Sequence, residues 1–383
     1  MSTPPSSTPP PRSTAPAGSN LTGLRDHNTA LVLSLLREAS RGSSRAELAT
    51  ATGLTPQAVS KIVARLLAAE LVAEDGRGPS TGGKPRTVLR LRPDAGFAVG
   101  VELDRRETTV LLVDLSGEVR HRATMPTGLA DAPPRRTVEL LATAVREALR
   151  AAPDGANLLG VGVGCRGPLD HAAGVLHRPA GLPAWDRFPL REALAAELAP
   201  LPVHLDKDTN TAALASAAPG QTAYLHFADG LGAGLLLDGA LYRGARTNAG
   251  EFGHQVLQLD GPPCRCGARG CLEALCLAAL DRDDTRTAAR LLAVGAANLV
   301  QLLDVDRLVL GGRTILAAPE PYLSEIAEQL ADRLPDRSWQ HVPVSLTPAG
   351  PAAVAIGAAE LVLAPVFGRG QGPGLRAEPV SRP

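Results

Sequence analysis

The chain of 383 residues is poor in aromatic residues, carries no net charge at neutral pH and contains only five cysteines. Aromatic residues make up 3% of it, so alanine and leucine must supply most of the packing among the 44% of residues that are hydrophobic. Lysine plus arginine and aspartate plus glutamate both number 39, so any attraction to a polyanion must come from how the charges are distributed. Few cysteines and no secretory features argue against a disulfide-stabilised scaffold.

The sequence also lacks the hydrophobic segments that direct a chain into or across a membrane. No apolar run approaches the roughly 20 residues of a membrane span. The N-terminus is rich in proline, serine and threonine, has Arg12 as its only charged residue, and lacks the apolar core of a signal peptide. We therefore expect a cytoplasmic protein with no membrane partner. Residues 1–20 and 367–383 are of low complexity, and both tails are predicted to be disordered.

The charges are unevenly distributed along the chain. Ten lysine and arginine residues face six acidic residues between Arg25 and Arg90, whereas the remainder of the chain is net acidic. A basic N-terminal part on an acidic body indicates a polyanionic partner for the first part only. Ordinary solvated surface charge produces the same bias, so this observation needs support from local motifs.

The basic part has the pattern of three short helices. Apolar residues recur at helical spacing within residues 24–39. Ser44 is predicted to cap a second helix, with Glu47 three positions later as its capping-box partner, and this helix ends at Gly53. Thr55 is predicted to cap a third helix with Pro56 at its first position, where a missing N–H costs nothing.

Two short helices joined by a glycine-containing turn predict a helix-turn-helix, with the third helix lying in the major groove. The outward positions of that helix carry no acid, and residues 71–74 and 87–91 read as a two-stranded wing with its tip at residues 78–86. The candidate DNA contacts are Ser44, Arg45, Thr55, Gln57, Ser60, Lys61, Arg65, Lys84 and Arg86. A winged helix that binds protein, or a helical linker, is the alternative interpretation.

Beyond residue 96 the pattern becomes that of an α/β fold. Short apolar runs alternate with amphipathic segments, which is typical of strands alternating with helices. Strands are predicted at residues 97–103, 109–114, 158–164, 224–227, 234–238 and 307–312, with a further strand leading into residues 205–210. Helices are predicted at residues 134–151, 211–218, 288–303, 322–334 and 354–361, and a loop at residues 281–286.

Three of the five cysteines lie close together. Cys264, Cys266 and Cys271 follow His254 by ten or more residues, and three thiolates with one imidazole suit tetrahedral zinc. Gly267 and Gly270 let the backbone turn tightly enough for both cysteine arms to reach one ion. A structural zinc site is therefore predicted, with a cluster of free thiols as the alternative. Cys165 and Cys276 are expected to be buried apolar residues.

Carboxylates flank this cluster at Glu251 and Glu273. Residues 249–254, Ala-Gly-Glu-Phe-Gly-His, and residues 264–273, Cys-x-Cys-Gly-x-x-Gly-Cys-Leu-Glu, resemble the motifs of the ROK family of bacterial sugar kinases and sugar-responsive repressors. The resemblance implies a two-lobed actin-like ATPase fold in which Glu251, His254 and Glu273 contact a hexose. It also places Asp208 at the position of the kinase base and Asn210 within the same motif, so both are candidate ligand contacts.

The chain departs from the kinases at the positions that hold nucleotide. The family's first phosphate loop, Asp-x-Gly-Gly-Thr, is replaced by Glu102-Leu103-Asp104-Arg105-Arg106, and Ala228-Asp229 replaces Gly-Thr in the second loop. Bulk and negative charge oppose phosphate at both turns, so no kinase activity is expected.

Two sugar contacts of the family are also changed, to Gly181 and Lys207. Lys207 favours an acidic or phosphorylated ligand, or else it points to solvent.

The N-terminal part resembles the winged helix of ROK repressors, with Gly83-Lys84-Pro85 where those proteins usually have Gly-Arg-Pro. We expect a winged helix-turn-helix at residues 21–92 and a ROK-type sensor domain at residues 93–366, forming a homodimer or dimer of dimers on operator DNA. The predicted function is a repressor that senses a sugar or phosphosugar. The alternatives are a sugar kinase with a DNA-binding head and a regulator whose sensor only dimerises.

Overall fold

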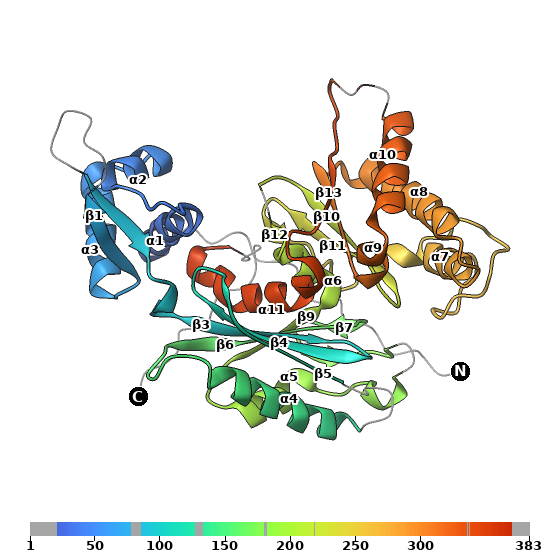
Figure 1. The fold of residues 1–383 in the computed structure, drawn as a ribbon, viewed down its shortest axis with the longest axis horizontal. Helices are drawn as coiled ribbons and strands as arrows, with labels where there is room; N and C mark the ends of the chain where they lie inside the picture. Colours follow the sequence, from blue (N-terminus) through green and yellow to red (C-terminus); the bar gives the residue numbers. More distant parts are fainter. Residues whose placement is uncertain are drawn as a thin grey trace, which may run out of the picture.

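The computed structural model describes residues 21–77, 86–126, 133–179, 182–217, 219–334, 336 and 338–369, with the side chains of residues 21–25 excepted. The chain forms a small helical head followed by two lobes, each built on a five-stranded sheet (Figure 1). The predicted N-terminal tail, the wing tip with Lys84, Gly181 and most of the C-terminal tail lie outside the described residues.

The head follows the sequence prediction closely. It contains α1 (Leu21–Glu38), α2 (Arg45–Thr52), α3 (Pro56–Ala68) and an antiparallel pair, β1 (Val72–Arg77) and β2 (Thr87–Leu91). Both arms of the capping box between Ser44 and Glu47 are formed, and the Thr55 side chain caps α3. These caps satisfy backbone N–H groups that a helix start leaves free, which is why the local sequence was sufficient to place the helices.

The first lobe is a mixed sheet in the order β5-β4-β3-β6-β9. Its strands are β3 (Phe97–Leu103), β4 (Glu107–Asp114), β5 (Val119–Pro126), β6 (Leu158–Cys165) and β9 (Val203–Lys207). Helices α4 (Pro134–Leu149) and α5 (Leu190–Leu198) pack on one face of the sheet. The sequence prediction missed β5, because this edge strand alternates between exposed and half-buried residues and offers no apolar run.

The second lobe has a sheet in the order β12-β11-β10-β13-β14. Its strands are β10 (Thr222–Phe227), β11 (Leu231–Leu237), β12 (Ala240–Leu241), β13 (Arg307–Gly311) and β14 (Val344–Leu346). The outer helices are α7 (Leu272–Leu280), α8 (Thr285–Leu303) and α10 (Pro319–Arg333), and the short α9 (Arg313–Ala317) follows β13. The predicted strand at residues 234–238 was wrong in its start, because β11 begins at Leu231.

Two helices fill the space between the sheets, α6 (Asp208–Leu214) and α11 (Ala353–Leu363) (Figure 1). A Cβ atom at Gly162 on β6 would lie 1.8 Å from the Ala358 carbonyl oxygen, and one at Gly357 would lie 1.6 Å from the Thr211 carbonyl oxygen. Gly162 therefore lets the backbone of α11 contact the first sheet, and Gly357 lets it contact the backbone of α6. The prediction of a helix at residues 211–218 was wrong in its bounds, since α6 begins and ends earlier.

One described segment, Gly350–Phe367, is long and apolar enough to cross a membrane, with a mean hydropathy of 1.7. This segment contains α11, and 61% of it is buried inside the protein. Its apolar character is that of a helix packed between two sheets, and the expectation that no apolar run approaches the length of a membrane span was wrong for this segment.

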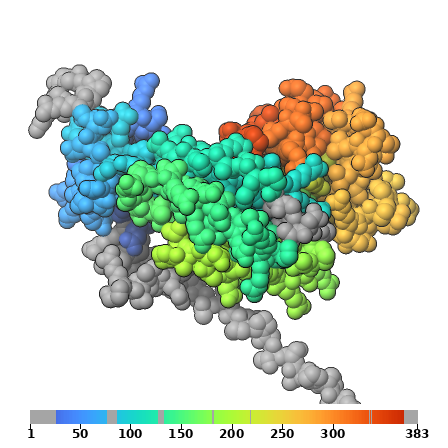
Figure 2. Space-filling view, turned by 60° about the horizontal axis from the view of Figure 1, so that its bottom comes forward, coloured from blue at the N-terminus to red at the C-terminus, as the bar shows by residue number. Residues whose placement is uncertain are grey.

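The head is anchored to α11. Arg37 of α1 forms a bidentate ion pair with Glu360 of α11, donates from Nε to the Ser116 carbonyl oxygen at 3.1 Å, and lies 4.6 Å from the ring centroid of Phe367. Core residues of the head, α11 and the inner face of the first sheet form one continuous hydrophobic cluster. Figure 2 shows the head at one end of the molecule and the outer helices of the second lobe at the other.

Candidate functional site

A cavity of about 560 Å³ lies between the two lobes. Residues that follow the carboxyl ends of β3, β6 and β9 line it from the first lobe, and residues from β10, β13 and the segment before α7 line it from the second. Ligands of open α/β sheets bind at this end of the strands. The topology therefore brings together most of the residues that the sequence motifs single out.

The predicted metal ligands converge. His254, Cys264, Cys266 and Cys271 place one potential ligand atom each within 4.8 Å of one another. The Cys266 and Cys271 sulfurs are 3.7 Å apart, and the Cys264 sulfur is 3.6 Å from His254 Nδ1. Tetrahedral zinc, with bonds of about 2.3 Å to sulfur and about 2.0–2.1 Å to nitrogen, sets these separations at about 3.8 and 3.6 Å. The cluster therefore fits a metal ion of that size.

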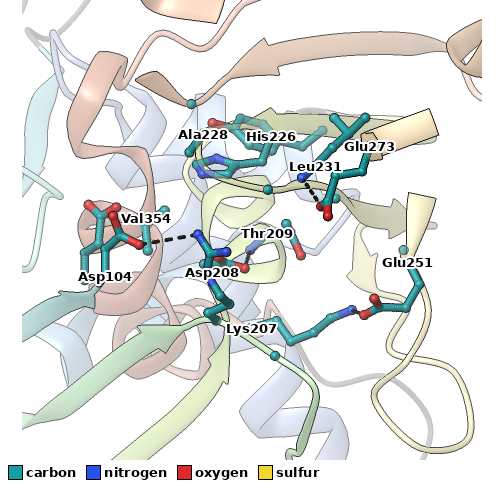
Figure 3. Close-up of a pocket in the computed structure, with 18 of the residues that line it drawn as sticks. Asp104, Lys207, Asp208, Thr209, His226, Ala228, Leu231, Glu251, Glu273 and Val354 are labelled. Carbon is teal, nitrogen blue, oxygen red and sulfur yellow. Dashed lines mark hydrogen bonds and ion pairs between the residues drawn. The ribbon is translucent and has the colours of Figure 1, made fainter. Parts of the chain in front are cut away.

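Glu251 faces the cavity between two nitrogen-bearing side chains. Lys207 Nζ donates to Glu251 Oε1 at 3.0 Å (Figure 3). It also donates to the Ala249 carbonyl oxygen at 2.7 Å, and His254 Nε2 lies 3.8 Å from Glu251 Oε2. The Lys207 side chain is only 3% exposed, so the alternative that it points to solvent was wrong. Its charge is already paired with Glu251, which removes it as a free site for an acidic or phosphorylated ligand.

Glu273 and Asp208 occupy the first turns of α7 and α6. Glu273 Oε2 accepts a hydrogen bond from the Leu231 N–H at 2.8 Å, which joins α7 to the start of β11. Asp208 Oδ1 accepts from the Thr209 N–H at 2.7 Å. A carboxylate is stabilised by the partial positive charge of a helix N-terminus, so both side chains present acceptor oxygens to the cavity.

Asn210 does not join them. Its side chain is fully buried, its Nδ2 donates to Asp206 Oδ1 at 2.7 Å, and it is not among the residues that line the cavity. Asp206 also accepts from Arg243 Nε at 2.7 Å. The prediction of Asn210 as a ligand contact is therefore corrected: it belongs to a polar network behind the strand end. A helical residue two positions after Asp208 points away from the side to which Asp208 points.

Charged residues replace both phosphate loops, and they are paired across the lobes. Arg313 at the start of α9 donates to Asp104 Oδ2 in the turn after β3 at 3.0 Å, and its other nitrogen pairs with Asp229 in the turn after β10. Arg106 donates to Asp229 Oδ1 at 3.0 Å. Burial opposes ionisation of Asp229, yet the two arginines lower its pKa. These ion pairs join the two turns.

Glu102 on β3 has the opposite electrostatic environment. Burial, with Asp104 and Asp208 nearby, raises its pKa from 4.5 to about 8. Burial also lowers the pKa of His226 on β10. Near neutral pH Glu102 and His226 therefore favour their uncharged forms.

The predicted DNA-contact residues fall into two groups. Gln57, Ser60, Lys61 and Arg65 are exposed along α3, although Arg65 Nη2 also donates to Thr29 Oγ1 at 3.1 Å. The other described residues make contacts within the head. Ser44 is buried and caps α2, and Thr55 caps α3. Arg45 pairs with Glu74 at 2.9 Å, and Arg86 lies 3.8 Å from Glu47. Ser44 is only 5% exposed, so the structure offers little of its hydroxyl to DNA.

Sequence reasoning missed Arg166, Thr209, His226 and Arg313 as cavity residues. Thr209 lies between Asp208 and Asn210 of a motif already singled out, His226 lies near the end of β10, and Arg166 and Arg313 follow β6 and β13 by one and two residues. Their position at or just after the ends of buried strands was the available signal. Which of them face the cavity depends on how the two sheets meet.

Comparisons with known proteins agree with this geometry. A model of the ROK family matches residues 98–280, and a model of winged helix-turn-helix DNA-binding domains matches residues 25–73. The xylose repressors of Caldicellulosiruptor bescii and Bacillus subtilis are 30% and 29% identical over 66% and 62% of this chain. The chain spans 64% and 63% of the length of these two relatives.

Two solved structures resemble the fold. A ROK hexokinase from Thermus thermophilus is 31% identical, covers 69% of this chain and 96% of its own, and has a TM-score of 0.57. A ROK family transcriptional regulator, a homologue of the Escherichia coli MLC protein, is 20% identical and covers 90% of this chain and 99% of its own with a TM-score of 0.69. The sequence motifs, the two-lobed fold and these matches show that the chain is a member of the ROK family with an N-terminal winged helix-turn-helix.

Proposed function

We propose that this protein is a transcriptional repressor that binds operator DNA through its head and senses a sugar or sugar derivative in the cleft between its lobes. One combination of features carries the proposal. The cleft keeps the acids at Asp208, Glu251 and Glu273, and the same chain has an acid-free helix face on its head. The repressor names of the related proteins support this reading.

The first part of the proposal is DNA binding by α3. Gln57, Ser60 and Lys61 follow one exposed face of this helix, and amide, hydroxyl and ammonium groups are suited to base edges and phosphates. In a homodimer two such helices contact two half-sites whose spacing follows from the dimer geometry. We place the protein in the cytoplasm, where its operator lies.

The second part is that the protein is not a kinase. Asp208 stands at the base position of the kinases, which favours catalysis as the competing function. The ion pairs of Arg313 and Arg106 with Asp104 and Asp229 join the turns that cradle phosphate in that family. An added phosphate has to break these pairs and face two carboxylates, so nucleotide binding is disfavoured.

Zinc is the metal we propose for the His254, Cys264, Cys266 and Cys271 cluster, because three thiolates with one imidazole suit it. Bound zinc is a structural ion that joins the two cysteine arms to His254. The chain's own contribution is to hold His254 with Nδ1 toward the cluster and Nε2 toward Glu251, so the metal site fixes one wall of the sugar pocket.

Communication between cleft and head is proposed to pass through α6 and α11. Asp208 and Thr209 begin α6, α6 meets α11 at backbone contact beside Gly357, and Glu360 of α11 holds Arg37 of the head. A sugar that favours one angle between the lobes moves α11, and with it the head. It changes DNA affinity only by as much as its affinity differs between the two conformations.

Two measurements test the function. Fluorescence anisotropy with DNA from upstream of the protein's own gene should show salt-dependent binding that a sugar weakens or strengthens. An ADP-release assay with ATP, magnesium and a hexose panel should show no turnover. Turnover that Asp208→Asn abolishes, with no binding to the upstream DNA, contradicts the proposal and favours the kinase.

A further inference from the structure

Ion pairs join the two lobes at the side of the cleft opposite Glu251. Asp104 and Arg106 lie in the turn between β3 and β4 of the first lobe, and Asp229 and Arg313 follow β10 and β13 of the second. Arg313 donates to Asp104 across the cleft at 3.0 Å, and Arg106 donates to Asp229 at 3.0 Å. Figure 3 shows Asp104 and Glu251 on opposite sides of the cavity. These pairs therefore hold together the side of the cleft away from Glu251.

The acids and the arginines of this side form a network. Asp104 also lies 3.7 Å from Arg166 Nη2, and Asp229 forms a second ion pair with Arg313. Each acid therefore has one arginine partner on its own lobe and one on the other lobe. A network of charges contributes to stability more reliably than an isolated surface pair. Separation of the lobes breaks the two pairs that cross the cleft and leaves the two within each lobe.

Buried contacts join the lobes elsewhere. Arg243 Nε of the second lobe donates to the fully buried Asp206 of the first at 2.7 Å, and the almost fully buried Lys207 bonds to the second lobe. By contrast, Arg106 and Arg313 are 71% and 39% exposed. Water and salt weaken exposed ion pairs far more than buried ones. The network is therefore the part of this lobe contact that opens at least cost.

The predicted sugar contacts come from both lobes. Asp208 follows β9 of the first lobe, whereas Glu251 and Glu273 belong to the second. A sugar that contacts all three side chains binds best when the lobes are close together. The ion pairs favour the same arrangement, so the sugar and the network stabilise one conformation. The apparent affinity for the sugar then falls with the fraction of protein in which the lobes are closed.

We propose that Asp104, Arg106, Asp229 and Arg313 form an interlobe latch, whose ion pairs hold the cleft closed and thereby raise its affinity for the sugar. These are positioning residues. Neither Arg106 nor Asp229 is among the described residues that line the cavity, so both act on the sugar through the angle between the lobes. The inference rests on the proposed sugar sensing and adds the charges that regulate it.

Variants of Arg106 and Asp229 in the full-length protein, with its metal bound, provide the test. Isothermal titration calorimetry measures binding of three uncharged sugars, glucose, xylose and N-acetylglucosamine, in about 50 and about 500 mM NaCl. Arg136→Gln is the matched control. Arg136 is 63% exposed and forms an ion pair of 3.0 Å with Glu139, but this pair lies within α4 and does not cross the cleft.

Arg106→Gln should weaken sugar binding about 2- to 5-fold in low salt, and Arg106→Glu should weaken it further. Asp229→Asn should weaken binding in the wild-type background. In the Arg106→Glu background it should strengthen binding, because it then removes a repulsion between the lobes. The affinity of the wild type for an uncharged sugar should fall in high salt, and that of Arg106→Gln should fall less. Arg136→Gln should behave as the wild type does.

Hydrogen exchange measured by mass spectrometry reports on the latch without any sugar. In Arg106→Glu, α9 and the turn after β10 should exchange faster than in the wild type, and in Arg136→Gln they should not. Equal exchange in all three proteins, or an Asp229→Asn effect of the same sign in both backgrounds, overturns the latch while sugar sensing stands. If no sugar binds the wild type, the sensing function fails, and the exchange measurement alone decides whether the latch exists.

Discussion

The contact between Arg37 and Glu360 should be a strong polar attachment of the head to α11, beside the hydrophobic cluster that the two share. The two side chains are 11% and 15% exposed, and their bidentate pair is supported by the Ser116 carbonyl oxygen and the Phe367 ring. Exposed ion pairs contribute about 0.2–1 kcal/mol, whereas removing one partner of a buried pair costs about 3–5 kcal/mol. With this degree of burial we expect a coupling free energy of about 2–3 kcal/mol.

A double-mutant cycle measures this coupling. Arg37→Ala, Glu360→Ala and the double variant are unfolded in urea and followed by far-ultraviolet circular dichroism, with hydrogen exchange of α1 as a local reading of head docking. Each single variant should lose protection in α1, and the double variant should be little worse than either. Arg41→Ala, an exposed arginine just beyond α1, is the control and should change stability by less than about 0.5 kcal/mol.

The same variants test the proposed communication. Sugar binding to Arg37→Ala should match the wild type, because Arg37 does not line the cavity. The sugar-induced change in DNA affinity should shrink, because the head no longer follows α11. A coupling free energy below about 0.5 kcal/mol, or a full sugar response in Arg37→Ala, refutes the reasoning.

Three further outcomes are expected. Lys61→Ala should weaken operator binding and lower the slope of log affinity against log salt by about one unit. The control Arg135→Ala, on the exposed surface of α4, should change neither. If the slope is unchanged in both variants, α3 does not lie on the DNA. Removing the metal with a chelator, or making Cys266→Ser, should lower the melting temperature and weaken the sugar response together. Metal analysis by mass spectrometry should find one zinc per chain. Full stability without metal contradicts a structural site. Glu102 has a folded pKa of about 8 against 4.5 unfolded, so its contribution to stability is fully present below pH 4.5 and is lost as pH rises through 8. Above pH 8, Glu102→Gln should therefore be more stable than the wild type, by a few kcal/mol at most, since each pKa unit is worth about 1.4 kcal/mol. Urea unfolding of both proteins at pH 6 and pH 9 measures this difference. If the stability of both proteins changes with pH in parallel, Glu102 is not buried in its acid form.

Local sequence was sufficient for the head and for the metal cluster. Ser44 with Glu47, and Thr55 with Pro56, satisfy the first N–H groups of their helices from within a few residues, so the caps formed where they were predicted. The cysteines and His254 lie within a short stretch whose glycines permit tight turns, and the structure brings their ligand atoms together. The apolar runs of β3, β4 and β6 also identified the centre of the first sheet, because strands buried on both faces need such runs.

Tertiary structure alone decided which polar residues share the cleft and what charge they carry. Lys207 looked free in the sequence, and only the approach of the loop before η3 (Phe252–His254) pairs it with Glu251. Asn210 shares a motif with Asp208, yet the turn of α6 places it behind the strand end. Arg313 and Asp104 lie 209 positions apart, and their pairing depends on how the second lobe closes over the first. Motifs record which groups are present, but pairing, burial and protonation follow from distances across the chain, which no local pattern contains.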